Sequence, residues 1–353
     1  MIWKFILKRI AYGFVVLLLV VTTISSIVYL APVDPARLTF GQNADAASIE
    51  SKRKELGLDK PLRVQLLYYL RDISPIAFHE DSPEAKAKYN YKKLFAIGEA
   101  ALVVKSPYLR TSFQSGRDVK EILASAIPRT AVLAFTAIGI GLVLGILLGI
   151  LAAVKQFSWF DNTAIVGSVL GYSLPSYVTA IIIAIVFGYY LADYTGLNLQ
   201  GSLVGIDDYG NEVYQWKNLI LPAVALGIRP VALITQLTRS AMLDVLNEDY
   251  IRTAKAKGLS RNKVIFKHAL RNALNPVVTA ASGWFAALLA GAFFVENVFN
   301  YNGLGWETVN ALINFDLPVV LGAVIFTAIV FVVINILIDI LYAFLDPRVA
   351  IGK

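Results

Sequence analysis

The sequence is short of the residues that bind metals and form disulfides. It contains no cysteine, which excludes disulfide bonds and thiolate metal ligands. Its two histidines, His79 and His268, lie too far apart in the sequence to indicate a metal site. Charged residues make up only 16% of the chain, against roughly a quarter in soluble domains. We therefore predict no metal and no cofactor, in a protein whose composition differs from that of a soluble one.

Catalytic motifs are missing as well. We find no nucleophile–base set, no Gly-rich phosphate loop and no carboxylate pair with a plausible partner. The motif GxxxxGK(S/T) is absent, so the chain cannot hydrolyse a nucleotide by that route. We therefore predict a protein that is not an enzyme. If ATP drives it, another polypeptide hydrolyses the ATP.

Long apolar segments are what the sequence has in abundance. Hydrophobic residues make up 57% of the chain, and about 20 consecutive apolar residues span the hydrocarbon core of a bilayer. Six segments have this character: Ile10–Ala31, Thr130–Val154, Thr163–Leu191, Leu219–Leu237, Val277–Val295 and Pro318–Leu345. We therefore predict an all-α polytopic membrane protein with six transmembrane helices.

The basic residues predict its orientation. An even number of spans puts both termini on one side, and Lys4, Lys8 and Arg9 place that side in the cytoplasm. The first apolar run is longer than the roughly 7–15 residues of a signal-peptide core and lacks a small-residue cleavage site, so we expect it to stay uncleaved. The basic loop 239–275 is then cytoplasmic too. Such loops explain the net charge of +7 without nucleic acid as a partner.

These spans divide the chain into four parts. They are the first transmembrane helix (1–31), an external segment (32–129), a five-helix core that includes the loop 239–275 (130–345), and a cytoplasmic tail (346–353). In the external segment, Ser48–Leu70 alternates charged residues with leucines, which favours one or two amphipathic helices. Asp72–Lys105 lacks a clear period, and we interpret it as an irregular insertion that forms a small cap on the outer face.

The cytoplasmic loop before the fifth span contains a strongly basic stretch, Asp249–Pro276. Its pattern predicts two short helices joined at Gly258, since glycine readily takes the left-handed conformation that ends a helix. Ser260 is placed to cap the second helix. A folded basic element between membrane spans indicates a binding partner outside the bilayer.

Two spans carry small or helix-breaking residues. Pro175 interrupts the third span between Ser173 and Ser176, because proline removes a backbone hydrogen bond and bends a helix. This break is either a structural kink or the lining of a translocation pathway, and the two are compatible. On the second span, glycines at a spacing that lets helix backbones approach closely indicate packing against a neighbour: Gly141, Gly145 and Gly149.

Arg229 is the sharpest polar feature of the predicted membrane region. It lies eleven residues beyond Asn218, roughly 16 Å along a helix axis. A cation at that depth costs at least about 2.5 kcal/mol, so it should face water, an acidic partner or a substrate. We weigh a position on the translocation pathway against a structural contact with another subunit or with carbonyls freed by Pro230.

Asp339 lies near the cytoplasmic end of the last span, which favours an inter-helix contact over a proton relay.

Short motifs along the chain resemble those of the dipeptide/oligopeptide/nickel class of ABC importer permeases. The motifs are Lys8-Arg9 with Ala31-Pro32-Val33-Asp34-Pro35, Leu237–Leu243, Asp249–Leu259, His268–Ala273 and Leu345–Val349. The resemblance covers nearly everything except roughly Asp72–Lys105. Arg252, Thr253 and Ala254 stand where the family pattern has an acidic residue and two alanines, and Gly258 is the retained glycine. Departures of this kind are usual in the peptide-type branch.

The resemblance implies a bacterial inner-membrane subunit of a binding-protein-dependent importer. Its partners would be a second homologous permease subunit, two cytoplasmic ATPase subunits, an extracytoplasmic substrate-binding protein and membrane lipids. A short helix of the cytoplasmic loop would dock into a cleft on the ATPase. The residues implied in this coupling are Tyr250, Arg252, Thr253, Ala254, Lys255, Lys257, Gly258 and Leu259.

The helix period refines this expectation. At 100° per residue, Tyr250, Ala254 and Lys257 share one face, with Arg252 and Lys255 on the other. Tyr250 would anchor in a pocket of the ATPase while the small Ala254 permits close approach.

For the translocation pathway we name Ser173, Pro175, Ser176 and Arg229.

Three alternatives stay open at this level. The same architecture imports nickel chelates or glutathione-like ligands in related permeases, so the substrate is not determined. An ion-coupled secondary transporter would need titratable groups near the middle of the bilayer, and Asp339 is too shallow. A purely structural or receptor-like membrane protein would leave the folded basic loop without a task.

Overall fold

The computed structural model describes residues 2–29, 36, 45–55, 57–98, 100–289 and 292–345. The chain forms two compact units. One comprises Met1–Ala11, Ile127–Trp306 and Ile329–Lys353, and the other comprises Tyr12–Ala126 and Glu307–Ala328. The motifs Ala31–Pro35 and Asp346–Val349 and the predicted tail 346–353 lie outside the described residues, as does the side chain of Asp339.

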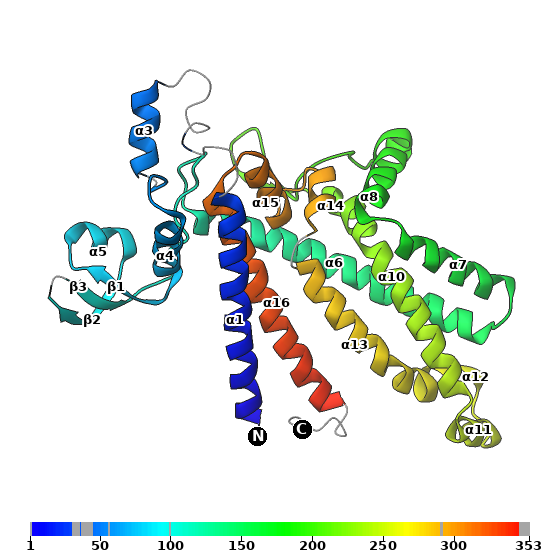
Figure 1. The fold of residues 1–353 in the computed structure, drawn as a ribbon. Helices are drawn as coiled ribbons and strands as arrows, with labels where there is room; N and C mark the ends of the chain where they lie inside the picture. The colour runs from blue at the N-terminus through cyan, green and yellow to red at the C-terminus, as the bar shows by residue number, and fades with distance from the viewer. Residues whose placement is uncertain are drawn as a thin grey trace. The chain divides into compact units, whose positions relative to one another are not determined.

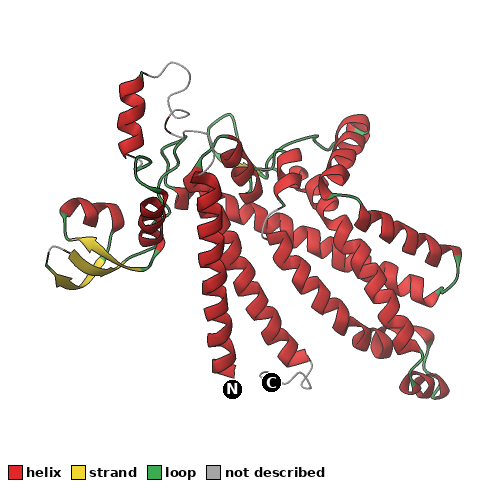
Figure 2. Cartoon of the chain, viewed as in Figure 1, coloured by secondary structure: helices red, strands yellow, loops and turns green. Residues whose placement is uncertain are grey.

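Most of the described chain is helical (Figure 2). The helices are α1 (Ile2–Tyr29), α3 (Ala46–Glu55), α4 (Leu62–Ile73), α5 (Pro83–Tyr89), α6 (Val119–Val154), α7 (Trp159–Ser173), α8 (Ser176–Ile185), the π-helical turn η1 (Val186–Tyr190), α9 (Ala192–Thr195), α10 (Lys217–Leu246), α11 (Asp249–Ala256), α12 (Arg261–Lys263), the π-helical turn η2 (Val264–Ala269), α13 (Leu270–Leu289), α14 (Phe293–Val298), α15 (Leu304–Ile313) and α16 (Leu317–Leu345). The strands are β1 (Ile76–Glu80), β2 (Lys92–Ile97), β3 (Ala100–Val104), β4 (Val204–Ile206) and β5 (Glu212–Tyr214).

Within the described residues, four helices are long and apolar enough to cross a membrane. They are Leu7–Ile27 of α1, all of α6 and α10, and Leu317–Ile338 of α16. The pair α7 and α8 with η1 adds a fifth if its two arms, bent by 106°, count as one span. The predicted fifth span, Val277–Val295, differs from what is observed. Polar residues occupy the first turns of α13, which ends at Leu289, and a separate α14 follows, so the count of six spans stays a prediction.

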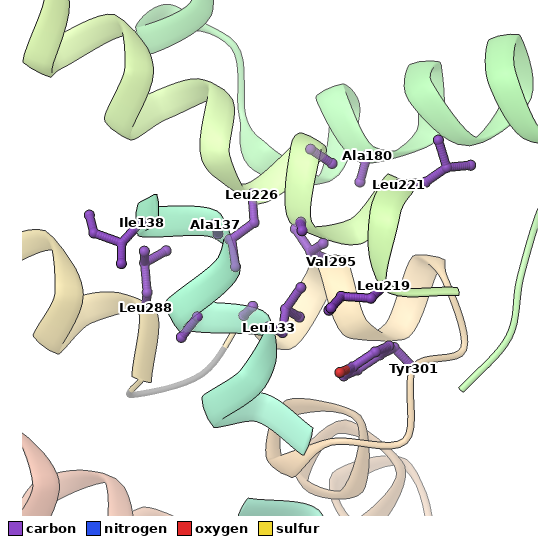
Figure 3. Close-up of a cluster of buried hydrophobic side chains, with 14 of the residues drawn as sticks. Leu133, Ala137, Ile138, Ala180, Leu219, Leu221, Leu226, Leu288, Val295 and Tyr301 are labelled. Atoms are coloured by element: carbon purple, nitrogen blue, oxygen red, sulfur yellow. The ribbon is translucent and has the colours of Figure 1, made fainter. Parts of the chain in front are cut away.

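The larger unit is built around α10. In Figure 1, α7 and α13 lie on either side of this helix, and both contact it. Buried aliphatic side chains from α6, α8, α10, α13 and α14 form one core, with Leu133, Leu226 and Val295 among its members (Figure 3). In a bilayer, such helices associate mainly through close van der Waals packing, because lipid tails are as apolar as these side chains.

The glycine row on α6 brings that helix against α10. A Cβ atom added to any of the three glycines would lie within 2.5–2.8 Å of an α10 side chain, namely Pro230 for Gly141, Ile234 for Gly145 and Thr238 for Gly149. Real side chains do not approach so closely, so only glycine permits this helix separation. The packing role predicted for the row is confirmed.

The predicted external segment begins with helices and continues with a sheet. One or two amphipathic helices are predicted over Ser48–Leu70. α4 confirms one of them, whereas α3 is a helix without an apolar face. The interpretation of Asp72–Lys105 as irregular is wrong, because β1, β3 and β2 form an antiparallel sheet in that order. Its strands place alanines and His79 on the covered face and leave Ile76 and Phe78 exposed. This arrangement reverses the usual burial pattern and hides the strand period in the sequence.

A buried carboxylate ties this sheet to α4. Asp72 is 3% exposed and accepts hydrogen bonds from the Tyr89 hydroxyl at 2.9 Å and from Arg110 Nε at 2.9 Å. The Lys105 ammonium donates to the Asp72 carbonyl. Burial lowers the pKa of the nearby His79, and Arg71 and Lys105 lower it further. This polar centre joins α4 to α5 and to the residue that follows β3.

Candidate functional site

The loop 239–275, which we predict to be cytoplasmic and to bind an ATPase, is a folded element. α10 ends at Leu246, and α11 begins at Asp249, after two intervening residues. The helix dipole favours an acidic side chain in this first turn. Gly258 follows α11 with φ of +75°, the left-handed conformation predicted for it. Ser260 stands at the N-cap of α12, but its side chain makes no capping hydrogen bond, so the predicted side-chain cap is wrong. The second helix instead continues through α12 and η2 into α13.

One face of α11 is buried within this chain. Ile251 is 0% exposed and Ala254 6% exposed, and both pack in an apolar cluster with Met242 of α10 and Val264 and Ile265 of η2. The close approach that Ala254 permits is therefore an approach to the chain's own helices. The helix period predicts that Ala254 shares an outward face with Tyr250 and Lys257. That prediction is wrong for Ala254, because its side chain faces α10 and η2. The apolar contact fixes α11 to the unit that contains α10 and α13.

The other predicted coupling residues face outward. Arg252, Thr253, Lys255, Lys257 and Gly258 are exposed. The ion pair between Arg252 and Asp249, with 3.5 Å between Nη1 and Oδ1, lies in solvent and contributes little to stability. The exposed face of α11 is thus basic and available to a partner.

Tyr250 is held in place by a second helix. Its ring is 40% exposed, and its hydroxyl accepts a hydrogen bond from Asn272 Nδ2 of α13 at 2.7 Å. This bond joins the start of α11 to the first turn of α13. A displacement of α11 would therefore be transmitted to α13.

A cavity of about 430 Å³ lies behind the turn that ends α11. Its walls come from the end of α6, the end of α10 and the start of η2, and Lys255, Leu259 and Arg261 lie at it. Of the predicted coupling residues, the exposed Lys255 and the half-buried Leu259 therefore border this cavity.

The break in the third predicted span is more than a kink. α7 ends at Ser173, and Leu174 and Pro175 are extended, with ψ of 132° and 139°, before α8 begins at Ser176. Extension before proline is expected, because the ring disfavours a helical residue there. The Ser173 hydroxyl donates to the Val169 carbonyl at 2.7 Å, so it bonds within its own helix. Ser173 and Pro175 are exposed, and Ser176 is half-buried.

Arg229 lies where α10 crosses α7 and α13. Its guanidinium carbon is 5.4 Å from the ring centre of Tyr172 on α7 and 5.8 Å from that of Trp284 on α13. The two rings meet edge to face, with 6.4 Å between their centres. Within the described residues Arg229 makes no ion pair, and its buried Nε has no hydrogen-bond partner.

An ion pair that the sequence did not predict joins α7 to α10. Asp161 is 1% exposed and accepts from Arg239 twice, from Nε at 2.5 Å and from Nη2 at 2.8 Å. Asp161 also closes the N-terminal turn of α7: its carboxylate accepts from the Phe157 amide, and Ser158 accepts from the Asp161 amide. The Ser-x-x-Asp spacing, a relative of the capping box, was the available signal.

A second buried carboxylate, Glu296, has only neutral donors around it. It is 0% exposed and accepts from the Thr130 hydroxyl at 2.7 Å and from the Trp306 amide at 3.0 Å. Burial raises the pKa of Glu296 to about 6, although its hydrogen bonds act in the opposite direction. No cation among the described residues pairs with it.

Two family models match consecutive parts of the chain. The description "Binding-prot-dependent transport system membrane comp, N-term" covers residues 1–134, and "Binding-protein-dependent transport system inner membrane component" covers residues 145–351. The second match includes the loop 239–275, the ion pair between Asp161 and Arg239, and Arg229.

Named relatives match over nearly the whole length. A putative peptide transport system permease protein of Brucella melitensis is 35% identical over 350 residues, covering 99% of both chains. The glutathione transport system permease protein GsiC of Salmonella typhimurium is 34% identical over 346 residues, covering 98% of both chains. Among solved structures, the MetNI methionine ABC transporter in inward-facing conformations matches with a TM-score of 0.51 and 18% identity, over 64% of this chain and 97% of that one. The last match shows a shared fold.

The two matched segments together contain nearly all of the apolar helices and the folded loop between α10 and α13, and the relatives match over nearly the whole chain. The chain therefore belongs to the family of binding-protein-dependent transport system inner membrane components.

Proposed function

We propose that this chain forms half of the translocation pathway of an ATP-driven importer of di- or oligopeptides. A second, similar permease would supply the other half. Two cytoplasmic ATPase subunits would bind below, and an extracytoplasmic substrate-binding protein would deliver the peptide. The family supports the importer, and the relatives named as peptide and glutathione transport permeases support the substrate class. Glutathione-like peptides remain the second candidate on the same ground.

The observation that carries the proposal is the two-faced build of α11. Its inner face is fixed to α10 and η2 through Ile251 and Ala254, and its outer face exposes Arg252 and Lys255. A helix built in this way transmits force from a partner to the membrane helices. In the proposed topology of six spans, with both termini in the cytoplasm, this outer face meets the ATPase.

The test separates docking from folding. Deleting Tyr250–Leu259 would remove the buried Ile251 and Ala254, so charge reversal of the exposed face is cleaner. We expect the double variant Arg252→Glu/Lys255→Glu to lose co-purification of the ATPase subunits while the permease stays folded. The matched control Lys263→Glu/Lys267→Glu reverses two exposed charges of the same loop beyond the turn.

The control variant should retain the ATPase, because we assign Lys263 and Lys267, which are four residues apart, to contacts with lipid headgroups. Retention of the ATPase by the Arg252→Glu/Lys255→Glu variant would contradict the coupling role of α11. ATP-driven uptake by the reconstituted assembly is the second readout, and it should fall in parallel with ATPase binding.

A further inference from the structure

Arg229 is an incompletely satisfied cation in the helix that forms the centre of its unit. It lies near the middle of α10, a helix apolar enough to span a membrane. At such a position a charge is costly and is normally paired or exposed to water. The described residues give Arg229 no carboxylate, and its buried Nε has no acceptor.

Two aromatic rings hold the guanidinium in place. Tyr172 and Trp284 approach it from different helices at 5.4 and 5.8 Å, within the range of cation–π attraction. Ring faces attract the charge but accept its N–H groups only weakly. A guanidinium has five N–H donors in a rigid fork, so donor capacity remains for a planar anion.

One of the two rings, that of Tyr172, belongs to the last turn of α7, next to the break between α7 and α8. Tyr172 is 48% exposed, and the next residues, Ser173 and Leu174, are exposed too. On its other side, α7 is pressed against α10, because a Cβ on Gly171 would lie 3.2 Å from Ile228. The half-buried Arg229 therefore contacts a ring that is itself partly exposed next to the break.

We propose that Arg229, positioned by Tyr172 and Trp284, binds the carboxylate of the transported peptide. This inference rests on the proposed function and adds a substrate requirement to it. A carboxylate matches the guanidinium fork with two parallel hydrogen bonds, and such charge-assisted pairs are the strong ones. The site thus selects peptides with a free C-terminal carboxylate over peptides in which that group is an amide.

The experiment uses the complete transporter, with permeases, ATPases and binding protein, reconstituted in liposomes. ATP-driven uptake of trialanine is compared with uptake of trialanine amide for the wild type, Arg229→Gln and Arg117→Gln. Arg117 lies exposed in a loop of the other unit and serves as a charge-matched control. Because the binding protein is the same throughout, any change in the ratio of the two uptake rates comes from the permease.

We expect Arg229→Gln to reduce the acid-to-amide uptake ratio by at least about tenfold, the loss typical of one hydrogen-bonded charge. Arg117→Gln should leave the ratio unchanged. Tyr172→Phe keeps the ring and should preserve the ratio, whereas Tyr172→Leu should reduce it.

An unchanged ratio in Arg229→Gln, or an equal loss of both peptides, would overturn the carboxylate assignment. Basal ATPase activity and thermal unfolding of each variant show whether an equal loss comes from misfolding, and Arg229→Lys then repeats the test with the charge kept. Wild-type protein that imports neither peptide would contradict the proposed function itself, and the assignment with it.

Discussion

Two arginines on α10, ten residues apart, have different kinds of contact partner: a carboxylate for Arg239 and aromatic rings for Arg229. Arg239 meets the buried Asp161 through two hydrogen bonds and joins α10 to the first turn of α7. Arg229 meets the faces of Tyr172 and Trp284 and keeps a buried Nε without an acceptor. The first site is complete within the chain, so we assign it to stability. The second lacks an anion, so we assign it to ligand binding.

The contrast is tested most directly by removing the carboxylate of the complete site. Asp161→Ala would leave Arg239 without its counter-ion and the Phe157 amide without its acceptor. We expect the free energy of unfolding to fall by about 3 kcal/mol, measured by denaturant titration in mixed micelles. The double variant Asp161→Ala/Arg239→Met should recover part of this loss. A double variant as unstable as the sum of the two single ones would argue against a coupled pair.

The helix packing beside both arginines offers the next test. Gly141 contacts Pro230, next to Arg229, and Gly149 contacts Thr238, next to Arg239. We expect Gly141→Ala and Gly149→Ala each to lower the free energy of unfolding by about 1–3 kcal/mol, because the added Cβ overlaps α10. Gly139 on the same helix has open space where a Cβ would lie, so Gly139→Ala should be neutral or stabilising. Equal effects of all three would refute the packing argument.

Glu296 extends the contrast, since it is a buried charge held by neutral donors. Its folded-state pKa of about 6 lies above its ordinary value of 4.5. The contribution of this group to stability is therefore fully present below pH 4.5 and is lost as the pH rises through 6, a loss of about 1–2 kcal/mol. We expect Glu296→Gln to remove that part of the pH dependence, measured as the difference from the wild type between pH 4 and 7. An identical pH profile in the two proteins would contradict the raised pKa.

The smallest effect on stability is expected at Arg229. Arg229→Gln removes a costly charge together with its aromatic contacts, and these terms oppose each other. The free energy of unfolding should change by less than about 1 kcal/mol, in the same assay as Asp161→Ala. A loss as large as that of Asp161→Ala would mean that Arg229 is structural, and the contrast between the two sites would disappear.

Much of the fold could be predicted from local pattern. The break at Pro175, the left-handed Gly258, the two helices before Asp72 and the glycine row of α6 each follow from residue type and spacing, and the structure has them. The sheet formed by β1–β3 could not be predicted in this way. Its large apolar side chains, such as Phe78 and Phe95, are exposed, whereas Ala101 and Val103 are buried, so the sequence gives no clear apolar face.

The candidate site shows the same division. The folded loop before α13 could be predicted from its run of basic residues, and Arg229 because a charge within an apolar segment is costly. The burial of Ala254 could not, since residues from α10 and η2 that are distant along the chain cover it. The pairing of Asp161 with Arg239 spans 78 positions, and no local period reports such a contact.

The sequence by itself determined the helical class, the family and the position of each costly charge, because these depend on composition, spacing and short motifs. Tertiary structure alone decided what each charge meets. Packing of α7 and α13 against α10 brought a carboxylate to Arg239 and two aromatic rings to Arg229. The physical reason is that charge neutralisation acts over a few ångströms in space, whatever the distance along the chain.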